Sequence, residues 1–118
     1  MPNRTASTTN EPDEAITRGT GNVFADLGYP AAEERQTKLR LAYAINKVIA
    51  RRRLTQAAAA EKLHVNQPKV SALARYKLDG FSVERLMGFL TALDQDVEIV
   101  IKQKPRSRAV ARILVVAA

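Results

Sequence analysis

The segment NQPKVSALARYK, residues 66–77, carries side chains whose types and spacing suit contact with the polar edges of nucleic-acid bases. The amide of Gln67 can form two hydrogen bonds with an adenine edge, and the ammonium of Lys69 can donate to guanine acceptors or to phosphate. Pro68 offers an apolar face that a thymine methyl group could contact. The candidates for contact with base edges are Gln67, Pro68, Lys69, Ser71 and Ala72, the last two being the weaker ones.

Lys69 is the unusual residue of this segment, because a cation near a helix N-terminus opposes the helix dipole. Its neighbours nevertheless predict that a helix begins here. Asn66 is a good N-cap, and Pro68 fits a first turn because its missing N–H would have had no partner there. We therefore expect a negative group opposite this end of the helix.

A second set of side chains suits contact with a phosphate backbone. Gln56 would open an earlier helix, whose free N–H groups can hold a phosphate. Further polar residues follow the segment at its C-terminal end, where a backbone should run. The basic run 51–53 could act in the same way, or simply complement the dipole of the helix that it ends. The phosphate candidates are Gln56, Asn66, Arg75, Tyr76, Lys77 and Arg53.

The charge of the chain is concentrated around these candidates. The 118 residues carry a formal net charge of +7, and residues 47–77 alone hold eight Lys and Arg against one acid, Glu61. Eight minus one equals the whole net charge of the chain. Such a localised basic field indicates a polyanionic partner such as DNA or RNA, the alternative being an ordinary solvated basic face.

Residues that would indicate enzymatic or metal chemistry are not gathered in the sequence. The chain has no cysteine, and its single histidine, His64, has no partner of ligand type near it. There is no paired-carboxylate motif, no glycine-rich phosphate loop and no nucleophile with a base, so we expect neither an enzyme nor a cofactor or metal site. No long apolar run could cross a membrane, and the composition fits a cytoplasmic protein.

Four helices are predicted to position the candidate residues. The polar residues 1–20 indicate a disordered N-terminal segment, and residues 21–94 a DNA-binding domain. Inside that domain we expect a long helix over 31–52 and three further helices that begin after the N-caps Thr55, Asn66 and Ser82. Residues 95–104 are interpreted as a dimerisation strand, and residues 105–118 as a basic and apolar tail.

The two short helices and the turn between them have the pattern of a helix-turn-helix. Ala60 falls where only a small side chain lets the helices cross closely. Val65, Val70 and Leu73 fill the inward positions. His64 falls at the turn position that needs left-handed geometry, where glycine is usual and histidine is tolerated. The second helix of such a unit enters the major groove, and a dimer reads the two halves of an inverted repeat.

The stretch 51–101, which contains LTQ, QPKVS, YKL, FSVERL and DVEIVI, resembles bacterial XRE-type helix-turn-helix proteins. It is most similar to the HigA-like antitoxins encoded beside RelE/HigB-type toxins, and with the segment upstream the likeness covers residues 22–103. Two positions depart from those proteins, Tyr76 and Asp94, where a glycine is frequent. The resemblance implies a mainly α, lambda-repressor-like bundle in a dimeric DNA-binding protein that represses its own operon. It also implies neutralisation of an mRNA-cleaving toxin, the alternative being a stand-alone repressor.

After Asp94 the apolar period changes from helical to two, which predicts a strand over 97–102. A strand without a partner is not stable. Three partners fit: the same strand of a second subunit, the tail ARILVV, or a strand of a toxin. We favour pairing across a two-fold homodimer. The predicted interface residues are Val97, Ile99, Val100 and Ile101.

Overall fold

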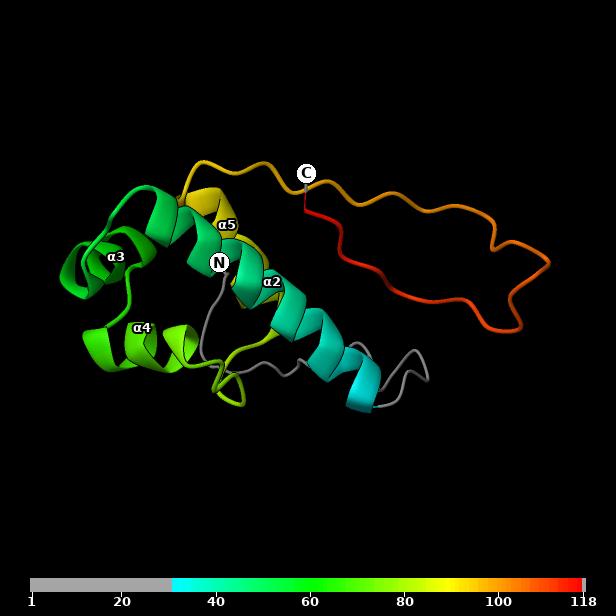
Figure 1. The fold of residues 1–118 in the computed structure, drawn as a ribbon, viewed down its shortest axis with the longest axis horizontal. Coiled ribbons are helices and arrows are strands. Elements are labelled where there is room, and N and C mark those ends of the chain that lie inside the picture. The colour runs from blue at the N-terminus through cyan, green and yellow to red at the C-terminus, as the bar shows by residue number, and fades with distance from the viewer. Residues whose placement is uncertain (1–30, 118) are drawn as a thin grey trace, which may run out of the picture. The chain divides into compact units, whose positions relative to one another are not determined.

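The helices of the molecule begin and end where the sequence supplies caps. A computed structural model describes residues 31–117, and Figure 1 shows its helices in chain order. They are α2 (Ala31–Arg51), α3 (Gln56–Leu63), α4 (Gln67–Ala74) and α5 (Val83–Ala92). The four predicted helices are thus confirmed, with bounds close to those expected. The disorder predicted for residues 1–20 lies outside the described residues.

Three helices have the N-caps that the sequence predicts. The side-chain oxygens of Thr55, Asn66 and Ser82 each accept a hydrogen bond of 3.0 Å from the backbone N–H three residues later. Each bond satisfies one of the N–H groups that a helix start leaves without a partner, and such a cap is worth about 1 kcal/mol. The starts of α3, α4 and α5 are therefore fixed locally by their own sequence.

Every helix of the described range is closed by a residue in left-handed conformation that is not glycine. At these positions φ is 56° in Arg53, 57° in His64, 60° in Tyr76 and 63° in Asp94. The next N–H then donates to a carbonyl five residues back, with lengths of 2.9–3.1 Å, which is the Schellman pattern (Leu54 to Ile49, Val65 to Ala60, Lys77 to Ala72, Gln95 to Leu90). The prediction for His64 is confirmed. Tyr76 and Asp94 adopt the geometry for which glycine is frequent in similar proteins.

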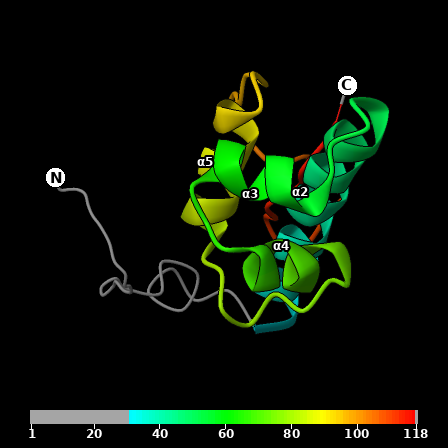
Figure 2. The ribbon, with the colours of Figure 1, turned by 90° about the vertical axis from the view of Figure 1, so that its left-hand side faces the viewer.

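Residues 35–117 belong to one compact unit, with its core between α2, α4 and α5. The apolar stripe of α2 meets α5 and the segment before it, where the rings of Phe81 and Phe89 pack edge to face with centroids 5.8 Å apart. Figure 2 shows α4 beneath α3, with α2 and α5 on either side. The core residues are Leu41, Ala42, Ile45, Val48, Leu63, Leu73, Leu78, Phe81, Leu86, Phe89, Leu90 and Leu93. Figure 1 likewise shows α2 running past the short helices.

The strand expected over 97–102 is not formed in this chain, and no residue among 31–117 belongs to a β-strand. Residues 96–117, here called the arm, leave the domain after α5 and return to it (Figure 1). Val97, near the start of the arm, and Val115, near its end, both pack against the core. Within the arm, one backbone hydrogen bond is formed: the N–H of Arg108 donates to the carbonyl of Pro105 over 3.2 Å and closes a turn. A strand exists only through hydrogen bonds to a neighbour, and the returning tail does not supply them.

The arm also exposes most of its apolar side chains. Of the residues predicted as a dimer interface, Ile99 and Val100 are each 75% exposed and Ile101 is 93% exposed. Val97 is instead half-buried against the core of its own domain. Six of the nine large apolar side chains that are exposed in the described residues lie in the arm.

Candidate nucleic-acid interface

Helices α3 and α4 pack as a helix-turn-helix around small side chains. Ala59 is fully buried and Ala60 nearly so, and both contact Val70 of α4 in a small apolar cluster. The predicted inward position Val65 borders this cluster, and Leu73 is buried in the main core. The turn between the helices reverses direction at His64, whose positive φ ends α3. The small residues of α3 therefore allow α4 to approach closely, with its opposite face left to solvent.

The C-terminal end of α4 is tied to the long helix by a side chain that the sequence reasoning missed. The amide nitrogen of Asn46 in α2 donates a hydrogen bond of 3.1 Å to the carbonyl oxygen of Leu73. This carbonyl lies in the last turn of α4 and also accepts a hydrogen bond of 3.1 Å from the N–H of Tyr76, so Asn46 is a second donor, from another helix. The available signal was a polar residue inside the apolar stripe of α2, between Ile45 and Val48. Asn46 therefore helps to set how α4 lies on the domain.

The five base-edge candidates do not all lie on one face of α4. Gln67 and Pro68 are exposed at its N-terminal end, and Ser71 is half-buried one turn later. Ala72 is half-buried and packs against the core, so the domain covers part of its side chain. Lys69 is also half-buried, and its side chain turns toward the segment between α4 and α5.

The side chain of Lys69 lies over the ring of Phe81 and beside Gly80. Its Nζ atom lies 5.1 Å from the centroid of the Phe81 ring, within the range of a cation–π interaction. A Cβ atom added to Gly80 would lie 3.3 Å from the same Nζ, which places the ammonium directly beside that glycine. The ring offers a partially negative face and so offsets part of the dipole opposition that made this lysine unusual.

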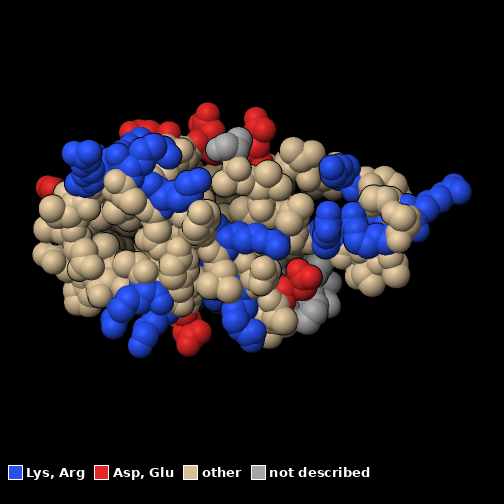
Figure 3. All heavy atoms as spheres, viewed as in Figure 1, with Lys and Arg blue, Asp and Glu red and all other residues tan. Residues whose placement is uncertain are grey.

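The six phosphate candidates are all exposed. They lie at four places: after α2, at the start of α3, at the start of α4 and in the segment after α4. The side-chain oxygen of Asn66 is already engaged as the cap of α4. Arg75 lies along the helix, with its Nε donating to the carbonyl of Ser71 over 3.4 Å. Figure 3 shows Lys and Arg side chains gathered near the C-terminal end of α2, near α4 and along the arm.

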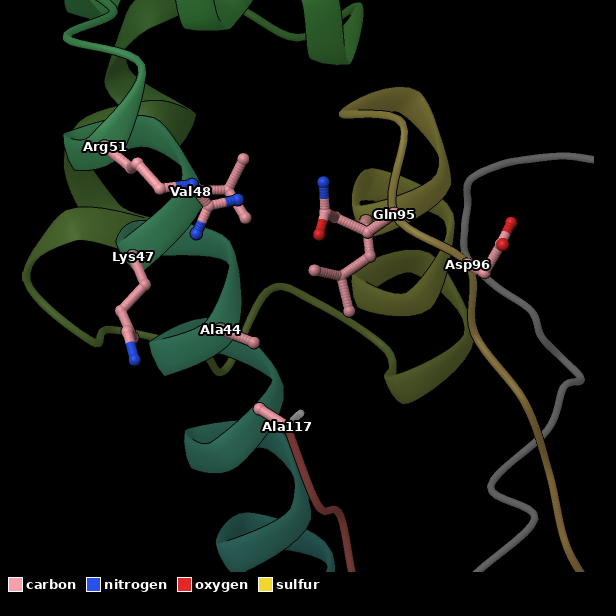
Figure 4. Close-up of a pocket in the computed structure, with 8 residues that line it drawn as sticks. Ala44, Lys47, Val48, Arg51, Gln95, Asp96 and Ala117 are labelled. Atoms are coloured by element: carbon pink, nitrogen blue, oxygen red, sulfur yellow. The ribbon is translucent and has the colours of Figure 1, made fainter.

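A pocket of about 220 Å³ lies between α2 and the two ends of the arm. Lys47 and Arg51 line it from α2, and Gln95 and Asp96 from the residues after α5. Figure 4 shows Arg51 extending toward Gln95, while the side chains of Lys47 and Asp96 point away from the space between them. Two cations, one carboxylate and an amide beside small apolar groups do not make a nucleophile–base arrangement. Over residues 31–117, no three His, Asp or Glu side chains come together as a metal site. No helix in this range is long and apolar enough to cross a membrane.

Comparison with known proteins shows which domain the chain contains. The family model described as a helix-turn-helix domain matches residues 23–102. A solved structure of a protein named as a candidate XRE-family transcriptional regulator is 78% identical to this chain and superposes with a TM-score of 0.73. The match covers 75% of this chain and 100% of that one. No curated protein matches the sequence.

Proposed function

Because the chain belongs to the XRE family of helix-turn-helix transcriptional regulators, we propose that it reads an inverted-repeat operator with α4. The observation that carries this proposal is the exposed N-terminal end of α4, which is capped by Asn66, while Asn46 ties the other end of the helix to α2. In a helix-turn-helix these first residues of the second helix meet the base edges. Gln67 and Pro68 occupy that end and are both exposed. The basic residues around α4 supply attraction to the backbone that does not depend on sequence.

The roles of the side chains follow from their places around α4. Gln67 is the main candidate for an adenine contact, with Pro68 and Ser71 beside it on the outer face. Gln56 at the start of α3, Arg53 after α2, and Arg75, Tyr76 and Lys77 after α4 would contact phosphates, because a backbone should flank a helix that lies in the groove.

The proposal is tested by selecting bound sequences from a randomised DNA duplex library with the purified full chain. A reader of an inverted repeat enriches two related half-sites whose centres lie about one helical turn, roughly 10 bp, apart. The same selection with Gln67→Ala should lose preference at a defined position in each half. A library that stays random after repeated rounds would contradict sequence-specific binding.

The proposal includes a homodimer formed through the arm. An inverted repeat requires two copies, and the side chains of Ile99, Val100 and Ile101 are large, apolar and exposed, as is common at interaction sites. Antiparallel pairing of residues 97–102 with their counterparts would supply the backbone hydrogen bonds that the single chain lacks. It would also bring Glu98 of one copy near Lys102 of the other. The returning limb of the arm, around Val110 and Leu114, could extend the same sheet.

The Ile99→Asp variant tests this dimer by sedimentation at micromolar concentration. The added charge should lower the dimer population and weaken operator binding without touching a base contact, because Ile99 lies outside the helix-turn-helix. Ser107→Asp is the matched control, because it adds the same charge to an exposed position of the arm outside the pairing segment 97–102. A variant that stays dimeric would place the interface elsewhere.

The proposed regulator also acts as the antitoxin of a RelE/HigB-like toxin, on the strength of the likeness of residues 22–103 to HigA-like antitoxins. Co-expression with the product of the neighbouring gene tests this role. Restored growth and a co-purifying complex support an antitoxin. If operator binding is present but no such gene or complex exists, the chain is a stand-alone repressor.

A further inference from the structure

Lys69 differs from the other polar residues at the start of α4 in the direction of its side chain. Val70 and Leu73 point into the core, and with 3.6 residues per turn the outward face opposite them is centred near Pro68. Lys69 lies on the flank between these faces, and its Nζ atom lies over the Phe81 ring. Phe81 is only 2% exposed, so the ring that receives the ammonium is fixed in the core.

The ammonium of Lys69 keeps hydrogen-bonding capacity in this position. An ammonium has three N–H donors, and a ring face engages only one side of it. Within the described part of the chain, Nζ forms neither a hydrogen bond nor an ion pair. Gly80 leaves the space next to it open: among residues 31–117, and apart from the chain neighbours of Gly80, the Nζ of Lys69 is the only heavy atom within 4 Å of a Cβ added there. A charged, directed donor therefore faces an exposed backbone segment without a side chain.

We propose that Lys69 and Gly80 form a phosphate-binding site for the DNA backbone, and that Lys69 does not read a base. This inference rests on the proposed function, because it takes the ligand to be a phosphodiester of the duplex in which α4 lies. A phosphate oxygen can approach Nζ beside Gly80 while the cation–π interaction with Phe81 is kept. A guanine contact would require the side chain to leave the ring and extend past the outer face of α4, which gives up an interaction worth about 0.5–2 kcal/mol.

The site explains why a lysine stands at the start of a recognition helix. The negative group expected opposite this end is the phosphate, and the Phe81 ring holds the cation in place before DNA arrives. A side chain that is already ordered loses less conformational entropy when it binds. Lys69 then contributes equally to every sequence, while discrimination is left to the exposed residues at the tip of α4.

The experiment compares the full chain with Lys69→Met, which keeps the length of the stem and removes the charge. Lys47→Met is the matched control, because Lys47 also lies over an aromatic ring, with Nζ 5.7 Å from the centroid of Tyr43, but on α2. Binding is titrated on the selected operator and on a scrambled duplex at several salt concentrations. Lys69→Met should weaken both duplexes by the same factor and reduce the salt slope by about 0.9 for each phosphate that is no longer neutralised. Lys47→Met should change neither.

A methylphosphonate scan of the operator locates the phosphate that Lys69 binds. One neutralised phosphate per half-site should weaken the wild type and leave Lys69→Met unchanged, since that variant already lacks the interaction. Gly80→Glu gives a second variant that keeps Lys69: its carboxylate would occupy the site and weaken both duplexes alike. A loss of affinity confined to the operator, with an unchanged salt slope, would make Lys69 a base reader and overturn the inference, as would no loss on either duplex. A wild type that binds all duplexes alike would contradict operator reading, whereas the salt slope of Lys69→Met still reports on the phosphate site.

Discussion

The helix-turn-helix and the arm use similar apolar residues with opposite results. In α4, Leu73 is 1% exposed and its carbonyl accepts a hydrogen bond from another helix. In the arm, Ile101 is 93% exposed, and no ladder of hydrogen bonds joins the two limbs over residues 96–117. Apolar content alone therefore does not distinguish a segment that packs into its own domain from one whose side chains stay exposed. The distinction depends on whether the rest of the same chain covers it.

The largest expected effect on stability comes from truncating a buried side chain of the helix-turn-helix. Leu73→Ala should lower the free energy of unfolding by about 2–5 kcal/mol, because it leaves a cavity in a closed core. Ile101→Ala is the matched control, and in the monomer it should change stability by no more than about 0.5 kcal/mol. Urea unfolding at a concentration where the chain is monomeric measures both. Equal losses would mean that the arm is packed in solution.

A smaller loss is expected from the bond that joins α2 to the recognition helix. Asn46→Ala removes the donor to the carbonyl of Leu73 and should cost about 1 kcal/mol of stability, the usual net value of such a bond. Gln103→Ala is the control, because this exposed amide in the arm can change without loss. If thermal melts of the two variants coincide, the Asn46 bond does not stabilise the position of α4.

The smallest expected effect is a gain in stability, caused by a substitution in the turn of the helix-turn-helix. His64→Gly should raise stability by about 0.5–1 kcal/mol, because glycine adopts the positive φ of the α3 C-cap without strain. Lys62→Gly, two residues earlier inside α3, should instead cost about 1 kcal/mol through reduced helix propensity. Thermal unfolding separates the two. A loss of stability at both positions would show that the His64 side chain makes up for its backbone strain.

Local features of the helical domain were predictable because neighbouring residues determine them. Caps at Thr55, Asn66 and Ser82 act over three residues, and the left-handed turn at His64 follows from the helix-turn-helix spacing. The bond from Asn46 to Leu73 joins residues 27 positions apart. The interaction between Lys69 and Phe81 joins two different elements. Neither follows from sequence periodicity, since both depend on how packed helices meet.

The conformation of the arm could not be predicted from the sequence, and the reason is a different one. Alternation of Val97, Ile99 and Ile101 is typical of a strand, but no strand is formed over these residues, because a strand also needs a neighbour. That neighbour is not supplied within the described residues of this chain, so the pattern alone could not decide the structure. Periodicity was therefore sufficient for α4, whose partners lie in the same domain, and insufficient for the arm.

The most direct test of base reading by α4 is a titration of Gln67→Ala against the selected operator and a scrambled duplex of equal length and charge. If Gln67 reads an adenine, the variant should bind the operator about 1–3 kcal/mol more weakly and the scrambled duplex as tightly as the wild type does. Equal losses on the two duplexes, or none on either, would contradict the claim that the exposed tip of α4 recognises sequence.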